Sequence, residues 1–267
     1  MKKIILIALS LSLFSCSNDD EGNSNTTETS DFTNALPLNN GNYWTYDVVG
    51  NTTTRDSLYI SGDTIIPPKT YKKFKNKNNI ATGFYCTSVN NNGVRKDGGK
   101  LLLSGDFSFG QGATLPVGLD LNLVDFIIFK EYATNGEILN EKTGTFQQDF
   151  NGTPLTIEYK LKSVGGENYA SYTSPNGDVY PNVKSTKVIL NLKVTTTQVF
   201  AGIPVTITIL QPQDVVTSLQ YLSKNIGVVY TNTLTTYSVD ATIATQLGIP
   251  PTNTQTQEEF LDTFLVN

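Results

Sequence analysis

The sequence contains no histidine. Without an imidazole, the chain cannot carry out Ser-His-Asp or Cys-His catalysis, and it cannot hold an imidazole zinc site or a zincin motif. It also lacks a G-x-S-x-G elbow, an S-x-x-K signature, a Walker loop and a G-x-G-x-x-G fingerprint. We therefore expect no metal and no cofactor. The catalytic chemistry that remains is that of two carboxylates, which the fold would have to hold about 5 to 10 Å apart.

The acidic residues of the sequence do not nominate such a pair. Several aspartates lie near predicted turns, where their usual roles are turn formation and solubility. We expect a non-enzymatic protein with no catalytic residue, and a hydrolase that uses a carboxylate pair stays open as the alternative. The aspartates near turns are Asp97, Asp106, Asp120, Asp125, Asp149 and Asp178.

Cysteine is scarce, with two residues in the chain, Cys16 and Cys86. If Cys16 carries lipid, Cys86 has no partner left for an intramolecular disulfide. Cys86 lies in the strand-like run from Gly83 to Val89, where a buried and inert thiol is expected rather than a reactive one.

Charge is also sparse, at 16% of residues, with a net charge of −5. Loss of Lys2 and Lys3 with a cleaved N-terminal segment removes two positive charges and takes the net charge to −7. An acidic surface repels phosphate backbones, so no nucleic-acid partner is expected.

What the sequence does have is an export signal at its N-terminus. Lys2 and Lys3 form a basic start, residues 4–14 are uncharged and mostly apolar, and Leu13-Phe14-Ser15-Cys16 reads as a lipobox. The apolar run is shorter than the roughly 20 residues of a permanent membrane helix. It predicts a signal peptide over residues 1–15 and lipidation, for example with palmitate, of Cys16.

The residues directly after the cysteine are Ser17, Asn18, Asp19, Asp20 and Glu21. This run resembles the acidic export signal of surface-exposed lipoproteins of Bacteroidota. The resemblance implies an outer-membrane lipoprotein displayed at the cell surface. The alternative is a plain acidic linker on a lipoprotein that faces the periplasm. Residues 16–34 are expected to be the lipidated cysteine and a disordered tether.

Residues 35–267 are expected to form one domain, which is mainly β. In residues 153–162 and 187–194, apolar and polar side chains alternate as in half-buried strands, and Ala201-Gly202 marks a hairpin turn before the next such run. Further hairpin signals are Asn92-Gly93, Asn135-Gly136 and Asn176-Gly177. This pattern predicts a single curved antiparallel sheet or open half-barrel with one to three short helices. The segments that fit either a short helix or a strand running into a loop are Leu119 to Asp125, Asp214 to Asn225 and Glu258 to Val266.

Two elements carry a further resemblance. Leu36 to Tyr46 resembles the first strand of many uncharacterised Bacteroidota lipoproteins, with a "G-N-x-W" turn, and Tyr221 to Val229 looks like a late element of the same group. Proteins with this pattern are similar to the β half-barrels of the lipoprotein carriers LolA and LolB, which implies a fold and leaves the ligand open. From its position in a two-faced strand, Trp44 is expected to anchor the core, and Gly41 and Gly227 to satisfy turn geometry.

The segment Gly165 to Pro181 is interpreted as a long loop that carries Tyr169, Tyr172 and Tyr180. Exposed tyrosines among small polar residues suit contacts with sugars or proteins, and the alternative is that they pack on their own sheet. Separately, Asp56-Ser57-Leu58 and Asp63-Thr64-Ile65 match the pattern for O-glycosylation in Bacteroidota, which makes Ser57 and Thr64 candidate acceptors.

These features predict a surface-anchored lipoprotein that acts as a non-enzymatic binding or interaction module. Its partners would be the membrane, through the lipid, and a glycan, lipid or protein ligand. A carboxylate hydrolase and a purely structural envelope protein remain as alternatives.

Overall fold

The computed structural model describes residues 34–109 and 118–267. The predicted signal peptide, the Cys16 lipidation site, the acid run Ser17–Glu21 and the tether up to residue 33 lie outside the described residues.

The domain is built almost wholly of antiparallel strands, as the alternating pattern predicts, with two short α-helices and one 3₁₀ turn. None of the helices in the described ranges is long and apolar enough to cross a membrane. The strands are β1 (Tyr43–Val49), β2 (Thr53–Ile66), β3 (Lys69–Asn76), β4 (Gly93–Asp97), β5 (Lys100–Phe109), β6 (Leu119–Lys130), β7 (Ile138–Phe150), β8 (Thr153–Thr173), β9 (Val179–Phe200), β10 (Ile203–Ser223), β11 (Gly227–Ser238) and β12 (Thr252–Leu265). The helices are η1 (Lys77–Asn79), α1 (Phe84–Val89) and α2 (Ala241–Leu247).

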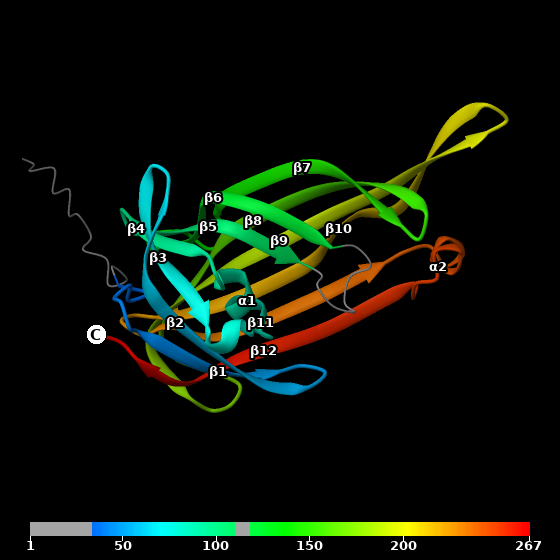
Figure 1. Cartoon of the computed structure of the whole chain (residues 1–267). Helices are drawn as coiled ribbons and strands as arrows, with labels where there is room; N and C mark the ends of the chain where they lie inside the picture. Colours follow the sequence, from blue (N-terminus) through cyan, green and yellow to red (C-terminus); the bar gives the residue numbers. More distant parts are fainter. Residues whose placement is uncertain (1–33, 110–117) are drawn as a thin grey trace, which may run out of the picture.

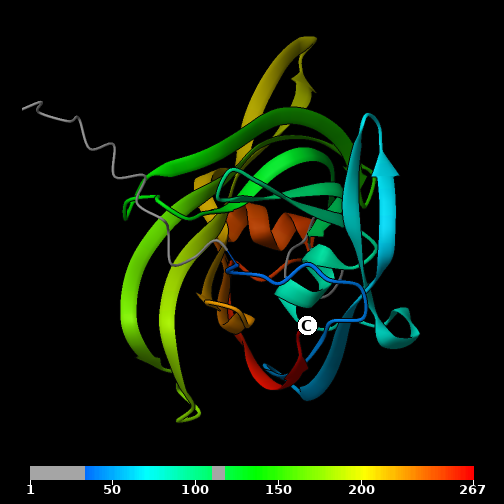
Figure 2. The same cartoon turned by 90° about the vertical axis from the view of Figure 1, so that its left-hand side faces the viewer.

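All twelve strands belong to one sheet, in the order β6-β5-β4-β3-β2-β1-β12-β11-β10-β9-β8-β7. The sheet curls until its two edges, β6 and β7, come into contact (Figures 1 and 2). Side chains tie the edges together, because the Ser163 and Thr186 hydroxyls of β8 and β9 donate to backbone carbonyls of β6, at Ile127 and Ile128. The sheet is therefore nearly closed into a barrel, and the expectation of an open half-barrel is wrong in this respect.

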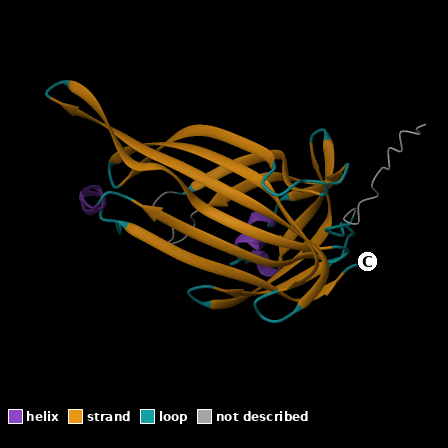
Figure 3. Ribbon diagram, turned by 180° about the vertical axis from the view of Figure 1, so that it is seen from behind, coloured by secondary structure: helices purple, strands orange, loops and turns teal. Residues whose placement is uncertain are grey.

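The core lies inside this curl, together with α1 (Figure 3). Side chains of β1 alternate as predicted, with Trp44, Tyr46 and Val48 buried inside. The Trp44 ring lies 6.1 Å from that of Phe74, and Tyr46 meets Tyr85 of α1 edge to face. The prediction that Trp44 is a core residue is confirmed.

The two elements that carry the family resemblance contact each other. The Trp44 indole N–H donates to the carbonyl of Ile226 at 2.6 Å, and the Tyr46 hydroxyl donates to that of Val228 at 2.8 Å. Gly227 has a φ of +112°, and a Cβ there would lie 2.9 Å from Leu36 and 3.1 Å from the Trp44 nitrogen. Glycine is required here for two reasons. Other residues rarely adopt a positive φ, and a side chain at this position would clash with Leu36 and Trp44.

The structure corrects the assignment of short helices. The three segments with ambiguous patterns belong to strands β6, β10 and β12, because pairing along the sheet outweighs partial helical spacing. Asp214, at the start of the second of these segments, accepts a hydrogen bond from Asn191 on the neighbouring strand at 2.8 Å. The run from Gly83 to Val89, which was expected to be a strand, instead forms helix α1, with Gly83 as its N-cap. Its N-terminal N–H groups are bound by side chains from distant strands, which a local pattern does not reveal.

Two of the four predicted hairpin turns are correct. Ala201-Gly202 joins β9 to β10, and Asn176-Gly177 lies in the turn between β8 and β9. Asn92-Gly93 instead leads from α1 into β4, and Asn135-Gly136 lies between β6 and β7, which are not hydrogen-bonded neighbours. Glycine after asparagine marks turns here, but the next strand need not pair with the previous one.

Candidate binding cavity

A cavity of about 660 Å³ opens inside the barrel, between α1, the β1–β2 turn and the inner faces of β11 and β12. This volume lies within the range of ordinary small-molecule sites. Its lining is rich in hydroxyl and amide side chains and contains few apolar ones, among them Phe84 and Val48. Among the described lining residues, Asp106 is the only charged one.

The polar wall of the cavity is formed by two cross-strand pairs of β11 and β12. Thr233 lies opposite Gln257, and Thr235 lies opposite Gln255. The first pair already has partners, since Gln257 accepts from the Phe84 N–H at 2.7 Å and Thr233 donates to Ser218 at 2.9 Å. Thr235 and Gln255 have no side-chain hydrogen bond within the described ranges. They are the donors and acceptors that a ligand could use.

The opposite wall is the N-terminal part of α1 and the segment that follows it. Thr87 of α1 lines the cavity and, within residues 34–109 and 118–267, has no side-chain hydrogen bond of its own. Asp106 accepts from Asn122 at 3.1 Å, so its charge is partly engaged at the rim. Phe84 provides the apolar surface, and its ring meets that of Phe107 edge to face at 6.2 Å. This combination of free hydroxyls and amides with one ring suits a neutral, hydrogen-bonding ligand.

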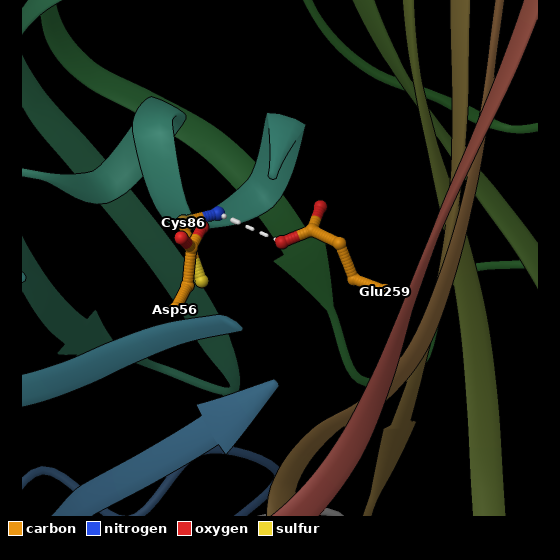
Figure 4. Close-up of side chains that lie close together, drawn as sticks. All are labelled: Asp56, Cys86 and Glu259. Carbon is orange, nitrogen blue, oxygen red and sulfur yellow. Dashed lines mark hydrogen bonds between the residues drawn. The ribbon is translucent and has the colours of Figure 1, made fainter. Parts of the chain in front are cut away.

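Two buried carboxylates hold the start of α1 in place (Figure 4). Asp56 of β2 accepts from the Thr82 and Gly83 N–H groups, the latter at 2.8 Å. Glu259 of β12 accepts from the Tyr85 N–H at 2.6 Å and from the Cys86 N–H at 3.2 Å. The helix is thus fastened at its start to two strands that are far apart in the sequence.

The chemical state of Glu259 follows from its burial. The pKa of its carboxyl group is raised to about 7, mainly by removal from water and also by the nearby Asp56 charge. Hydrogen bonds from the Tyr85 and Cys86 N–H groups and from the Thr231 hydroxyl oppose this shift. Burial is the largest of these effects, so the carboxyl group titrates near neutral pH.

Asp56, Cys86 and Glu259 also bring together two oxygens and a sulfur within 4.8 Å of one another, the kind of group that can hold a metal ion (Figure 4). Both carboxylates, however, already accept several N–H groups, whose positive ends point at the oxygens where a cation would bind. None of the three lines the cavity. We therefore interpret the group as the anchor of α1.

Cys86 itself is fully buried, as predicted. Burial raises the pKa of its thiol well above the usual value, and the Glu259 and Asp56 charges raise it further. The reactive thiolate is therefore suppressed at neutral pH.

The structure places the candidate tyrosines elsewhere, on the outer face of the sheet. The presumed long loop is a hairpin in which β8 and β9 continue to Thr173 and Val179. Tyr169 and Tyr172 join a row of rings with Tyr221, Tyr230 and Phe260. Tyr180 is the cross-strand partner of Tyr172, and its hydroxyl lies 3.4 Å from the carbonyl oxygen of Leu261.

This row is poorly suited to binding sugars. The Tyr172 and Tyr221 rings stack at 4.2 Å with an interplanar angle of 19°, so each covers a face of the other. A sugar stacks on a free aromatic face, and two rings that stack on each other leave less free face for a sugar. The alternative in which the tyrosines pack on their own sheet fits better, since they fasten the β8–β9 hairpin to the strands beside it.

The six aspartates do not converge on one site, although Asp97 and Asp125 share Arg95. Asp125 is bound by Arg95 and Lys69, at 2.8 and 2.7 Å, which hold the pKa of its carboxyl group far below the usual range. Asp97 also pairs with Arg95. Asp149 and Asp178 belong to turns, as expected, and Asp120 is exposed on β6. Only Asp106 reaches the cavity.

The two candidate glycosylation sites differ in access. Both acceptors lie in strand β2, but Asp56 and Leu58 around Ser57 are buried. Asp63 and Ile65 around Thr64 are exposed. In the folded protein, Thr64 is the better candidate, and its modification stays a prediction.

The cavity residues Thr235 and Gln255 are functional candidates that sequence reasoning missed. They lie in Thr- and Gln-rich stretches that read as polar loop or strand. One signal was present, because polar residues occupy alternate positions 255 and 257 on the same strand face as the buried residues 259 and 261. When polar residues continue the inward-facing side of a strand, they indicate that the interior beside them is open to solvent.

Comparison with known proteins adds little. No family model matches the chain, and no curated protein matches it. A solved structure described as a "putative lipoprotein" from Parabacteroides distasonis is similar in fold, with 12% sequence identity, a TM-score of 0.37, and 86% of this chain and 98% of that chain covered.

Proposed function

We propose that this protein is a surface-anchored outer-membrane lipoprotein that binds a neutral, hydroxyl-rich ligand, such as an oligosaccharide, in the cavity beside α1. The observation that carries the proposal is the cavity of about 660 Å³ with unpaired hydroxyl and amide groups on its β11–β12 wall. An unpaired polar group that can recover a hydrogen bond favours a ligand with matching groups.

The distribution of charge supports a neutral ligand. A cavity with a single, partly engaged carboxylate gives little attraction for a cation, and the net charge of −5 opposes anions. An apolar ligand fits less well, because the apolar part of the interior near α2 is filled. The space left among Leu155, Leu210 and Tyr237 is only about 30 Å³, too small for an acyl chain.

The alternatives have less support. For a hydrolase, Asp56 and Glu259 have carboxylate oxygens within 4.8 Å of each other, but both side chains are buried and bound by N–H groups at the start of α1. A purely structural role does not explain the size of the cavity or the unpaired side chains of Thr235 and Gln255.

The binding proposal is tested by titrating the mature protein with a panel of neutral oligosaccharides, and with acidic oligosaccharides and fatty acids for comparison. Thr235→Val keeps the shape of the side chain but removes its hydroxyl, and should weaken binding about 3- to 10-fold, the value of one hydrogen bond. Thr254→Val on the outer face of β12 is the matched control and should bind as wild type. A preference for fatty acids, or equal effects of the two variants, would refute the proposal.

The anchoring part of the proposal rests on the basic start, the apolar run, the lipobox and the acids after Cys16. Mass spectrometry of the mature N-terminus should find a lipidated Cys16. Alanine at Asp19, Asp20 and Glu21 should leave lipidation intact and abolish cleavage by protease added to whole cells. An intact N-terminal peptide with an unmodified Cys16 contradicts the anchor, and unchanged protease access contradicts surface export by the acid run.

A further inference from the structure

The β9–β10 hairpin projects beyond the end of the barrel as a free arm (Figures 1 and 3). Its tip is apolar and exposed. The exposed fractions are 69% for Val199, 53% for Phe200 and 65% for Ile203. Exposed apolar residues that occur singly are normal, but a contiguous group on a projecting arm marks a contact surface.

The arm also lacks charge. Between Lys193 and Asp214 the sequence has no acidic or basic residue. Successive side chains of a strand point to opposite faces, and the tip is apolar on both. Phe200 is paired with Ile203, and Val199 with Pro204 on the other face. A protein groove covers one face of such an arm, whereas a lipid phase surrounds both.

The backbone of the tip permits a shallow insertion into lipid. Peptide groups in an apolar phase must have their hydrogen bonds satisfied within the segment. The groups between β9 and β10 meet this requirement, because their pairing continues to Phe200 and Ile203 and a two-residue turn closes it, with positive φ at Ala201 (51°) and Gly202 (82°). The outer edges of the arm have no partner strand, since β8 pairs with β9 only up to Thr196 and β11 with β10 only from Val216. Only the short tip can therefore enter the acyl region. Behind the tip, Thr197 and Thr206 are paired, and their hydroxyls are suited to contact with lipid headgroups.

We propose that the β9–β10 tip inserts into the surface layer of a lipid bilayer, with Val199, Phe200 and Ile203 among the acyl chains. No basic residue lies at the tip, so insertion should not require anionic lipid. The start of the described chain, drawn in blue, lies at the end of the domain opposite the tip (Figure 1). The tip would thus be a membrane contact separate from the N-terminal anchor. This proposal is independent of the cavity and its ligand.

The test uses the full lipidated protein in phosphatidylcholine vesicles whose acyl chains carry bromine, which quenches tryptophan within the bilayer. The Phe200→Trp variant places a probe at the tip. Its matched control is Phe264→Trp, an exposed aromatic (41%) near the C-terminus at the opposite end. Phe264 is the cross-strand partner of Trp44, so far-ultraviolet circular dichroism, and not the emission of Trp44, reports that each variant is folded.

We expect the added tryptophan of the Phe200→Trp variant to be quenched several-fold more strongly than that of the Phe264→Trp variant. Adding Ile203→Asp should abolish the difference, since a charge at the tip opposes insertion. Equal quenching of the two probes would overturn the proposal. A second outcome would also overturn it. If the protein self-associates with rising concentration, Ile203→Asp removes this association, and the tryptophan at position 200 is not quenched, then the tip binds a second copy of the chain.

Discussion

Trp44 joins three parts of the chain that are distant in sequence. Its ring packs against Phe74 of β3, its N–H is bonded to Ile226, and the missing side chain of Gly227 leaves room for its edge. The aromatic and glycine elements seen in the sequence are therefore two halves of one contact. This contact explains their co-occurrence without any role in binding.

Trp44→Ala should destabilise the fold by about 3 to 5 kcal/mol, through lost burial and the cavity left behind. Tyr43→Ala, at the neighbouring and half-exposed position, is the control and should cost much less. Urea unfolding measures both. If the two variants unfold at similar urea concentrations, Trp44 does not anchor the core.

Glu259 makes stability depend on pH. Its folded-state pKa is about 7, raised from an ordinary value of 4.5, so the folded state binds more protons than the unfolded state between these values. The stability it contributes is present below about pH 4.5 and is lost as the pH rises through 7. Glu259→Gln should flatten this decline, measured by urea unfolding at pH 5 and pH 8.

Glu258→Gln is the control for this slope, because the Glu258 side chain lies on the outer face with the Tyr230 hydroxyl. It should retain the wild-type dependence on pH. A slope that is the same in the wild type and in Glu259→Gln would show that Glu259 is not the group that titrates.

At the scale of elements, the β8–β9 hairpin is fastened by its aromatic row. Because the Tyr172 ring stacks on Tyr221 and lies 6.3 Å from Tyr230, Tyr172→Ala removes two ring contacts to other strands, besides its contact with Tyr169 on its own strand. We expect the free energy of unfolding to fall by roughly 1 to 3 kcal/mol, at about 0.5 to 1.5 kcal/mol for each of these two ring pairs. If Tyr172 were an exposed loop residue, its replacement would change the free energy of unfolding very little.

Hydrogen exchange should show this loss locally, as faster exchange in the hairpin from Tyr169 to Val183. Val179→Ala at an exposed position of the same hairpin is the control and should leave exchange unchanged. Unaltered protection in Tyr172→Ala would mean that the aromatic row does not hold the hairpin down.

The elements also show where prediction from sequence succeeds. The period of two in residues 153–162 and 187–194 predicted β8 and β9, because the alternation reflects burial on one face of a strand. Helix α1 was missed because its stabilisation comes from Asp56 and Glu259, 27 and 173 residues from the groups they bind. The Tyr169–Tyr172 segment was read as loop because its partners, Tyr221 and Tyr230, lie on other strands.

For the whole molecule, the sequence predicted one antiparallel β domain but not its degree of closure. Closure depends on contacts between β6 and the side chains of Ser163 and Thr186, which are separated from it by tens of residues. The cavity depends on closure, since β11, β12 and α1 enclose a space only when the sheet curls around them. A site formed in this way leaves only a faint local signal, here the inward-facing Gln255.

The central claim is that a neutral, hydroxyl-rich ligand binds against the inner wall of β11 and β12. The most direct test is nuclear magnetic resonance of the side-chain amides during titration with the tightest-binding neutral oligosaccharide. The account predicts that the Gln255 amide shifts with ligand, whereas the Gln198 amide near the hairpin tip does not. Shifts confined to the outer aromatic row, or no shift at Gln255 at saturating ligand, would contradict it.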